Sequence, residues 1–108
     1  MNQLEKYLDM LKRKKKVFDK EAIEKQNELF QLHWNTKSHY CESCKAYLGK
    51  ENKTIFHDHL LEKSKYPEYR YELWNLYLVC LACHDEKTRG FPTEKHKLAI
   101  EEALKRIN

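Results

Sequence analysis

Four cysteines arranged in two Cys-x-x-Cys pairs are the feature that most restricts the fold of this chain. The pairs are Cys41/Cys44 and Cys80/Cys83, and the chain has no other cysteine. A Cys-x-x-Cys turn directs two thiolates to one point, so two such turns supply the four ligands of a tetrahedral zinc ion. We therefore predict a structural zinc site. The residues between the pairs, 45–79, exceed the usual gap of a zinc ribbon, so we expect a folded element there.

Disulfide bonds are one alternative for these cysteines, and buried thiols that bind nothing are another. The N-terminus is polar and charged and lacks the apolar segment of a signal peptide, so we expect a reducing, cytoplasmic location. We expect no membrane partner, because no apolar run approaches the roughly 18 residues that a membrane-spanning helix needs. These expectations favour thiolates on zinc. His39 and His84 could each replace one thiolate, but four cysteines already complete the ligand shell.

The charge of the chain permits a polyanionic partner without requiring one. There are 21 basic and 17 acidic residues, which give a formal net charge of +4. Five of the basic residues are consecutive, and such a run is either a solvated face or a contact with a nucleic-acid backbone. These five are Lys12, Arg13, Lys14, Lys15 and Lys16.

Residues 1–37 are predicted to form an N-terminal helical segment. Neither Gly nor Pro occurs in residues 1–48, and the segment reads as one long helix or as two helices broken at 17–19, where Asp19 could cap the second. We expect its first apolar stripe to pack onto the rest of the protein. The alternative is that the stripe pairs with a second copy in a homodimer. The stripe consists of Leu4, Tyr7, Leu8 and Leu11.

Residues 38–108 are predicted to form the second unit, which begins with two short strands. Residues 54–57 and 76–79 are rich in β-branched and aromatic side chains, and this composition predicts a strand at each place. The residues between them are mostly polar and predict a loop.

Two helices are predicted to follow the strands. The segment His84–Lys87 predicts a helix start, and Gly90 with Pro92 marks a turn. Thr93 is a suitable N-cap for a last helix, whose apolar residues should pack into the core. These apolar residues are Leu98, Ile100, Ala103, Leu104 and Ile107.

A second group of metal-binding side chains lies between and beside the cysteine pairs. Asp58 and His59 follow the first predicted strand, and His84 follows the second cysteine pair. A zinc ion that joins the two pairs would bring His84 close to that strand. A carboxylate and an imidazole, completed by water, suit Mg²⁺ or Mn²⁺. Adjacent strand residues point to opposite faces, so Asp58 and His59 share a site only if the strand ends there. His57 is predicted to be a packed or surface histidine.

The order of these motifs resembles the HNH endonuclease (ββα-metal) family in its form with a four-cysteine zinc site. The resemblance covers residues 41–90, and the loop 63–71 is similar to that of phage-type recombination nucleases. It implies an α+β fold with a small ββα-metal core, flanked by a long N-terminal helical segment and a C-terminal helix. The matching motifs are the Cys pairs, Asp58-His59-Leu60, Asn75-Leu76 and Cys83-His84-x-x-Lys87-Thr88.

The resemblance implies a role for each matching residue in hydrolysis of phosphodiester bonds in DNA. His59 would be the general base, Asp58 and His84 would hold a catalytic Mg²⁺ or Mn²⁺ ion, and Asn75 would orient the His59 loop. One departure is Glu62, where many members have proline. Five basic residues would contact the nucleic acid, namely Lys63, Lys65, Arg70, Lys87 and Arg89.

A blander interpretation exists for each of these residues. Asn75 could simply cap a turn, Lys87 and Arg89 could be solvated charges, and Asp58 could form a surface ion pair. The alternative to an endonuclease is a non-catalytic zinc-stabilised module that binds nucleic acid or protein. That alternative does not explain why all the residues of a nuclease site occur together.

Overall fold

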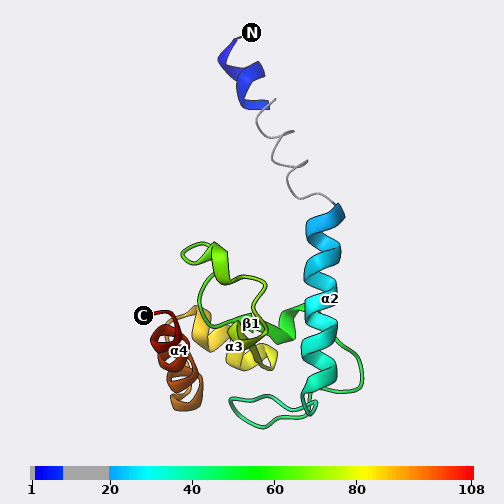
Figure 1. Cartoon of the computed structure of the whole chain (residues 1–108), viewed down its shortest axis with the longest axis vertical. Coiled ribbons are helices and arrows are strands. Elements are labelled where there is room, and N and C mark those ends of the chain that lie inside the picture. The colour runs from blue at the N-terminus through cyan, green and yellow to red at the C-terminus, as the bar shows by residue number, and fades with distance from the viewer. Residues whose placement is uncertain (1, 9–19) are drawn as a thin grey trace.

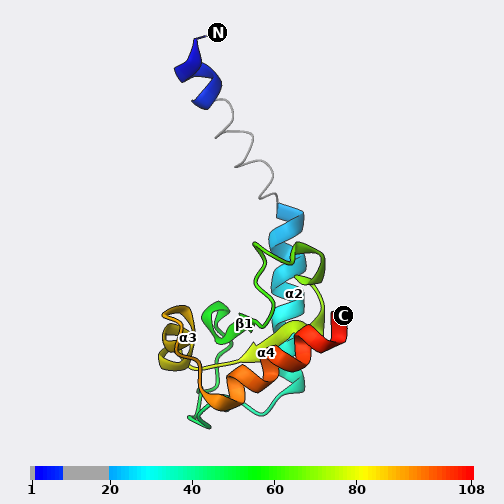
Figure 2. The ribbon, with the colours of Figure 1, turned by 90° about the vertical axis from the view of Figure 1, so that its left-hand side faces the viewer.

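A computed structural model describes residues 2–8 and 20–108 of the protein. Helices surround a two-stranded antiparallel sheet, so the fold class is α+β, as predicted. Residues 3–8 are helical as well. The main elements, in chain order, are α2 (Lys20–Thr36), β1 (His57–His59), β2 (Leu76–Leu78), α3 (Leu81–Thr88) and α4 (Glu94–Ile107). Figures 1 and 2 show α2 and α4 on opposite sides of the sheet.

The sheet is short, and its first strand begins later than predicted. β1 pairs with β2 so that Asp58 lies opposite Tyr77. The strand predicted at 54–57 is wrong, because Thr54–Phe56 form a 3₁₀ helix and pairing starts only at His57. The backbone N–H of Phe56 donates to Lys53 O at 3.0 Å, which closes the turn. Tertiary context therefore overrides the β-propensity of this segment. The strand predicted at 76–79 is confirmed, one residue shorter.

The helix after the second cysteine pair also begins elsewhere than predicted. α3 starts at Leu81, inside the pair, and the Cys80 sulfur caps it by accepting from the backbone N–H of Cys83 at 3.5 Å. The predicted start at His84–Lys87 is wrong because a cysteine sulfur acts as the N-cap. The predicted turn is present at Gly90, whose φ is +90°.

The last helix confirms its predicted cap. Thr93 Oγ1 accepts from the backbone N–H of His96 at 3.2 Å and satisfies a free donor of the first turn of α4. Leu98 is 56% exposed, so its predicted place in the core is wrong. The other predicted apolar residues of α4, Ile100, Ala103, Leu104 and Ile107, belong to the core or pack against it.

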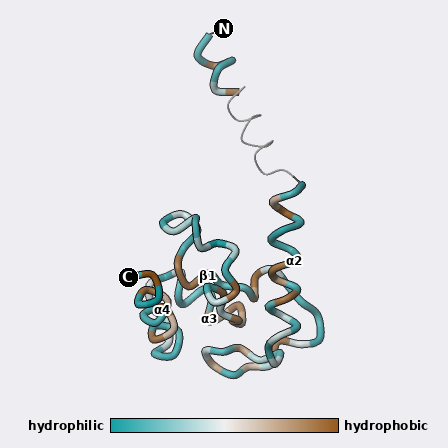
Figure 3. The backbone as a smooth tube through the Cα atoms, viewed as in Figure 1, coloured by the Kyte–Doolittle hydropathy of each residue, from teal (hydrophilic) through white to brown (hydrophobic). Residues whose placement is uncertain are grey.

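The core lies between the sheet and the helices. Figure 3 shows hydrophobic segments around β1 and along the neighbouring part of α2. The predicted unit boundary lies after residue 37, and α2 ends at Thr36, with its Trp34 packed into the core beside the sheet. No helix of the described ranges is long and apolar enough to cross a membrane. The buried cluster includes Trp34, Leu48, Phe56, Leu60, Leu61, Tyr77, Leu78, Val79 and Ala103.

The N-terminal apolar stripe does not pack as expected. Leu4, Tyr7 and Leu8 are 65%, 54% and 48% exposed, whereas we expected them against the core. Their exposure is what the alternative, pairing with a second copy, requires. Leu11, Asp19 and the basic run 12–16 lie outside the described residues.

Candidate functional site

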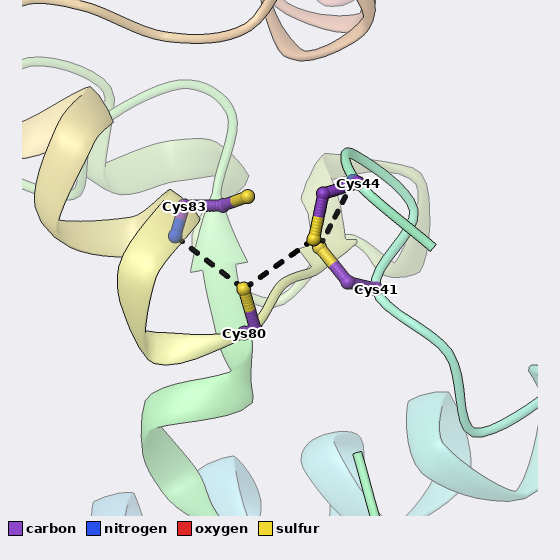
Figure 4. Close-up of side chains that lie close together, drawn as sticks. All are labelled: Cys41, Cys44, Cys80 and Cys83. Atoms are coloured by element: carbon purple, nitrogen blue, oxygen red, sulfur yellow. Dashed lines mark hydrogen bonds between the residues drawn. The ribbon is translucent and has the colours of Figure 1, made fainter. Parts of the chain in front are cut away.

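The four cysteines converge on one point, as the spacing of the two pairs predicted. Their sulfur atoms all lie within 4.8 Å of one another, and no cysteine is in a disulfide. Figure 4 shows the side chains meeting from the loop that carries Cys41 and Cys44 and from the start of α3. Cys44 Sγ and Cys80 Sγ are 3.7 Å apart. Zn–S bonds of about 2.3 Å give tetrahedron edges of about 3.8 Å, whereas a disulfide bond is about 2.05 Å long. The donor set therefore fits zinc.

The backbone of the first pair favours a thiolate. The backbone N–H of Cys44 donates to Cys41 Sγ at 3.4 Å, and Lys45 takes a positive φ of +70° to close the turn. Burial raises the pKa of the Cys41 thiol, but backbone N–H donors from Cys44, Cys80 and Ser43 outweigh it and lower the pKa to about 7. A metal ligand must be deprotonated, so these donors favour the metal-binding form of Cys41, whereas burial and the neighbouring sulfurs raise the pKa of the Cys83 thiol.

Glu42 attaches the first cysteine turn to the sheet. Its backbone N–H donates to Leu78 O at 2.7 Å, and its carboxylate accepts from the backbone N–H of Leu78 at 2.7 Å. Cys80 follows two residues after Leu78, so this pair of hydrogen bonds brings the two cysteine turns together. His39 stays outside the site and stacks on Trp34, with ring centroids 3.7 Å apart.

A second site is a cavity of about 280 Å³ between the sheet, α3 and α2. It brings together the predicted residues Asp58, His59 and His84, and β1 ends at His59. Within the described residues, however, the four cysteines are the only group of three or more candidate ligands close enough to share an ion. The cavity is lined by Gln26, Phe30, Thr54, His57, Asp58, His59, Glu62, Lys63, His84 and Lys87.

His59 is held in a form that can accept a proton. Its Nε2 lies 3.0 Å from Arg70 O. A carbonyl oxygen only accepts, so Nε2 carries the proton and Nδ1 has a lone pair; within the described residues no hydrogen bond to Nδ1 is found. Burial lowers the pKa of His59, and the charges of Lys63 and Lys87 lower it further, against the opposing effects of the Arg70 carbonyl and Asp58. The neutral imidazole is therefore the resting form near pH 7.

Asn75 fixes the backbone at both ends of that hydrogen bond. Its side chain is fully buried, and its Oδ1 accepts from the backbone N–H of Leu61 at 2.7 Å. Its Nδ2 donates to Leu61 O at 3.2 Å and to Tyr69 O at 3.1 Å. Leu61 follows the His59 segment and Tyr69 precedes Arg70, so one amide orders the base and the carbonyl that orients it.

We expect Asn75→Ala to destabilise the protein by about 2–4 kcal/mol, because the buried N–H and carbonyl of Leu61 lose their partner and the Tyr69 carbonyl keeps only the N–H of Glu72. Urea unfolding of the zinc-loaded protein measures the change. Asn35→Ala is the matched control, since Asn35 is exposed on α2 and its loss should cost at most about 0.5 kcal/mol. Equal stabilities of the two variants would support the interpretation of Asn75 as a simple turn cap.

The carboxylate of Asp58 already has two partners, an ammonium and an imidazole. Lys87 Nζ lies 2.8 Å and 3.0 Å from its two oxygens, and His96 Nε2 of α4 lies 2.9 Å from Oδ2. Burial raises the pKa of Asp58, but the hydrogen bond from His96 and the charge of Lys87 outweigh it and lower the pKa below its usual value. Asp58 and Lys87 thus form a buried ion pair, not a surface one, and Lys87 contacts a carboxylate where phosphate was expected.

The other predicted nucleic-acid contacts are spread over the surface. Lys63 lines the cavity and also a neighbouring hollow of about 220 Å³, which it shares with the half-buried Arg70 and with α2. Lys65 and Arg89 are exposed. His84 is 38% exposed and its Nδ1 lies 3.8 Å from Asp85 Oδ1.

Sequence reasoning missed a buried histidine pair that joins α2 to β1. His33 Nδ1 and His57 Nδ1 are 2.8 Å apart, and the Phe30 ring stacks on His57 at 4.5 Å. His57 Nε2 donates to Asn52 Oδ1, so His57 Nδ1 accepts and His33 Nδ1 donates. The interpretation of His57 as a packed histidine is confirmed. His33 was detectable, because it shares the apolar helix face of Phe30 and Trp34.

This pair makes stability depend on pH. Burial lowers the pKa of His33 and of His57 to about 4 from 6.5. As the pH falls, these histidines are protonated in the unfolded state before they are protonated in the folded state. The stabilisation given by the neutral pair is therefore complete above about pH 6.5 and is lost as the pH falls toward 4. We expect the free energy of unfolding of His33→Phe to fall less steeply than that of the parent in this range, by up to about 1.4 kcal/mol per pH unit. The four cysteines are the same in both proteins, so equal slopes would contradict the assignment of this pH dependence to the histidine pair.

No protein-family model, no curated protein and no solved structure matches this chain.

Proposed function

We propose that this protein is a metal-dependent endonuclease of the HNH (ββα-metal) class that hydrolyses phosphodiester bonds in DNA. One observation carries the proposal. His59, whose Nδ1 lone pair has no hydrogen-bond partner in the part of the chain that the structure describes, lines a cavity together with Asp58, His84 and Lys63. A general base beside potential ligands for an ion and a cationic side chain is what attack of water on a phosphodiester requires.

His59 would take the proton of the attacking water on Nδ1. Its Nε2–H keeps the hydrogen bond to Arg70 O throughout, so the ring does not have to turn during proton transfer. Asp58 precedes it in the chain, and its negative charge favours the imidazolium that forms. Lys63, which lines the cavity, would supply positive charge for the phosphate, and Asn75 would keep the His59 loop in place.

Asp58 and His84 are the side chains that would hold the catalytic Mg²⁺ or Mn²⁺ ion. Both line the cavity, and a carboxylate with open positions for water suits either ion. When bound, the ion supplies Lewis-acid stabilisation of the phosphate and of the leaving oxygen. The structural zinc site is a separate centre, since all four of its ligands are cysteines.

The alternative is a zinc-stabilised module that binds nucleic acid or protein without cutting it. It accounts for the cysteine centre and the charge equally well. It gives no reason for a histidine whose tautomer is fixed by Arg70 and whose loop is held by a fully buried asparagine.

Cleavage of supercoiled plasmid and of branched DNA tests the proposal. The zinc-loaded parent should cut DNA with Mn²⁺ or Mg²⁺, and His59→Gln should not. A parent that retains zinc and binds DNA but cuts none of it would support the binding module. Cleavage of RNA alone would retain the site and change the substrate.

A further inference from the structure

We propose that Lys87 is an internal competitor for the catalytic ion, holding Asp58 in the free protein and leaving it when the ion binds. This inference rests on the ion site of the proposed function and adds a residue that controls its affinity. Lys87 lies one helical turn after His84 on α3, so the two residues approach the cavity from the same helix face.

The Lys87 ammonium uses all of its hydrogen-bonding capacity on the candidate site. Its Nζ lies 3.0 Å from Asp58 Oδ1, 2.8 Å from Asp58 Oδ2 and 2.9 Å from His59 O. An ammonium has three N–H groups, and these three contacts account for all of them. The side chains of Lys87 and Asp58 are only 14% and 7% exposed, so water screens the pair weakly.

This arrangement opposes binding of a divalent ion. An ion on Asp58 needs the same carboxylate oxygens, and its charge would repel an ammonium a few ångströms away. With Lys87 bound, the carboxylate charge is already neutralised. His96 is a different kind of partner, because it approaches Oδ2 alone and comes from α4, outside the cavity lining. Lys87 is therefore the partner that the ion must displace.

Exchange of one cation for the other avoids leaving a charge unpaired. Removing one member of a buried ion pair is costly because the remaining charge is uncompensated. Here the incoming ion would compensate Asp58. The Lys87 side chain has a flexible stem and lines the cavity, so its ammonium can turn toward an anionic phosphate in the same space. Substrate and ion should then favour each other's binding, since both draw Lys87 away from Asp58.

Mn²⁺ binding measured by electron paramagnetic resonance tests the competition without any substrate. The proteins are the zinc-loaded parent, Lys87→Met and Lys63→Met, each checked for zinc content and native circular dichroism. Lys63→Met removes the same charge from the same cavity, and it is the matched control because the Asp58 carboxylate is bonded, among the described residues, by Lys87 and His96 and not by Lys63. We expect Lys87→Met to bind Mn²⁺ at least tenfold more tightly than the parent, Lys63→Met to stay within about threefold of the parent, and Asp58→Asn to abolish the site in the Lys87→Met background.

Equal affinities of Lys87→Met and Lys63→Met would overturn the inference, and so would the absence of Mn²⁺ binding in every protein. Cleavage is judged separately. If the parent cuts DNA while Lys87→Met and Lys63→Met bind Mn²⁺ equally, the proposed function stands and the role of Lys87 is removed. If Lys87→Met binds Mn²⁺ tenfold more tightly but the parent never cuts DNA, the role of Lys87 at the ion site stands and the proposed function is removed.

A second measurement uses the unaltered protein, so it remains decisive if Lys87→Met fails to fold. The ¹⁵N-labelled Lys87 ammonium should give a protected NMR signal in the free protein, because all its N–H groups are bonded. Saturating Mg²⁺ should abolish that protection, and the NMR signal of the Asp58 carboxylate shows that the ion has bound. A Lys87 signal that stays protected with Mg²⁺ bound would show that the ion does not displace it.

Discussion

His59→Gln is expected to lower the rate of DNA cleavage by about 10²- to 10⁴-fold, the usual contribution of a general base. Glutamine can still donate an N–H to Arg70 O, so the hydrogen bond that orients the side chain is kept while the basic Nδ1 is lost. Single-turnover kinetics at saturating ion concentration measure the chemical step. Zinc content and melting temperature should stay close to those of the parent, because His59 belongs neither to the cysteine centre nor to the buried core.

His39→Gln is the matched control for that substitution. His39 stacks on Trp34, away from the cavity, and its replacement should leave the cleavage rate unchanged. Equal rates for parent and His59→Gln would remove His59 from the mechanism.

The pH dependence gives a second check on the same residue. Only the neutral imidazole accepts a proton, and burial lowers the pKa of His59. The cleavage rate should therefore rise with pH along a curve whose midpoint lies below pH 6.5, and it should be constant near pH 7. A midpoint above pH 7 would assign the base to another group.

The parts of the site that sequence alone predicted are those set by local spacing. Each Cys-x-x-Cys turn brings its own two sulfurs together by local geometry, and the two predicted halves meet with Cys44 Sγ 3.7 Å from Cys80 Sγ. The cap at Thr93 was readable for the same reason, because its partner lies three residues away. The predicted strand at 54–57 failed because burial of Phe56 and the turn from Lys53 decide that segment, and neither is a property of composition.

The partners of Asp58 could not be read from the sequence. Lys87 and His96 are 29 and 38 residues away from it, and His33 is 24 residues away from His57. Such pairs depend on how the helices pack, and a lone lysine or histidine gives no sign of them. A partial signal did exist, since His96 lies on the stripe that continues through Ile100 and Ala103 and so was bound to face the core.

The buried ion pair of Asp58 limits which substitutions can measure the stability that zinc gives. Asp58→Ala should itself be destabilising, because it leaves the charge of Lys87 unpaired. A cysteine substitution reports on a bound metal only if it leaves the stability of the metal-free protein unchanged. Cys44 meets this condition because it is exposed.

We expect Cys44→Ser to destabilise the zinc-loaded protein by at least about 3 kcal/mol, a fall in melting temperature of more than about 10 °C. An exposed thiol contributes little to packing, and exposed substitutions ordinarily change stability by about 0.5 kcal/mol or less. A large effect therefore has to come from the bound ion, whose binding free energy is also folding free energy. Melting curves and zinc content of parent and variant give the measurement.

The metal-free proteins complete the comparison. After removal of zinc by a chelator, parent and Cys44→Ser should melt together at a low temperature, because both then lack the ion. Restoring zinc should raise the melting temperature of the parent by far more than that of the variant. If zinc changed the melting temperature of neither protein, or if the difference between them persisted without zinc, the four cysteines would be free thiols and the centre would not be a zinc site.

The shape of the cavity should also depend on zinc, since the first cysteine turn and the start of α3 flank the sheet that carries Asp58 and His59. Loss of zinc should therefore also abolish DNA cleavage, although none of the cysteines lines the cavity.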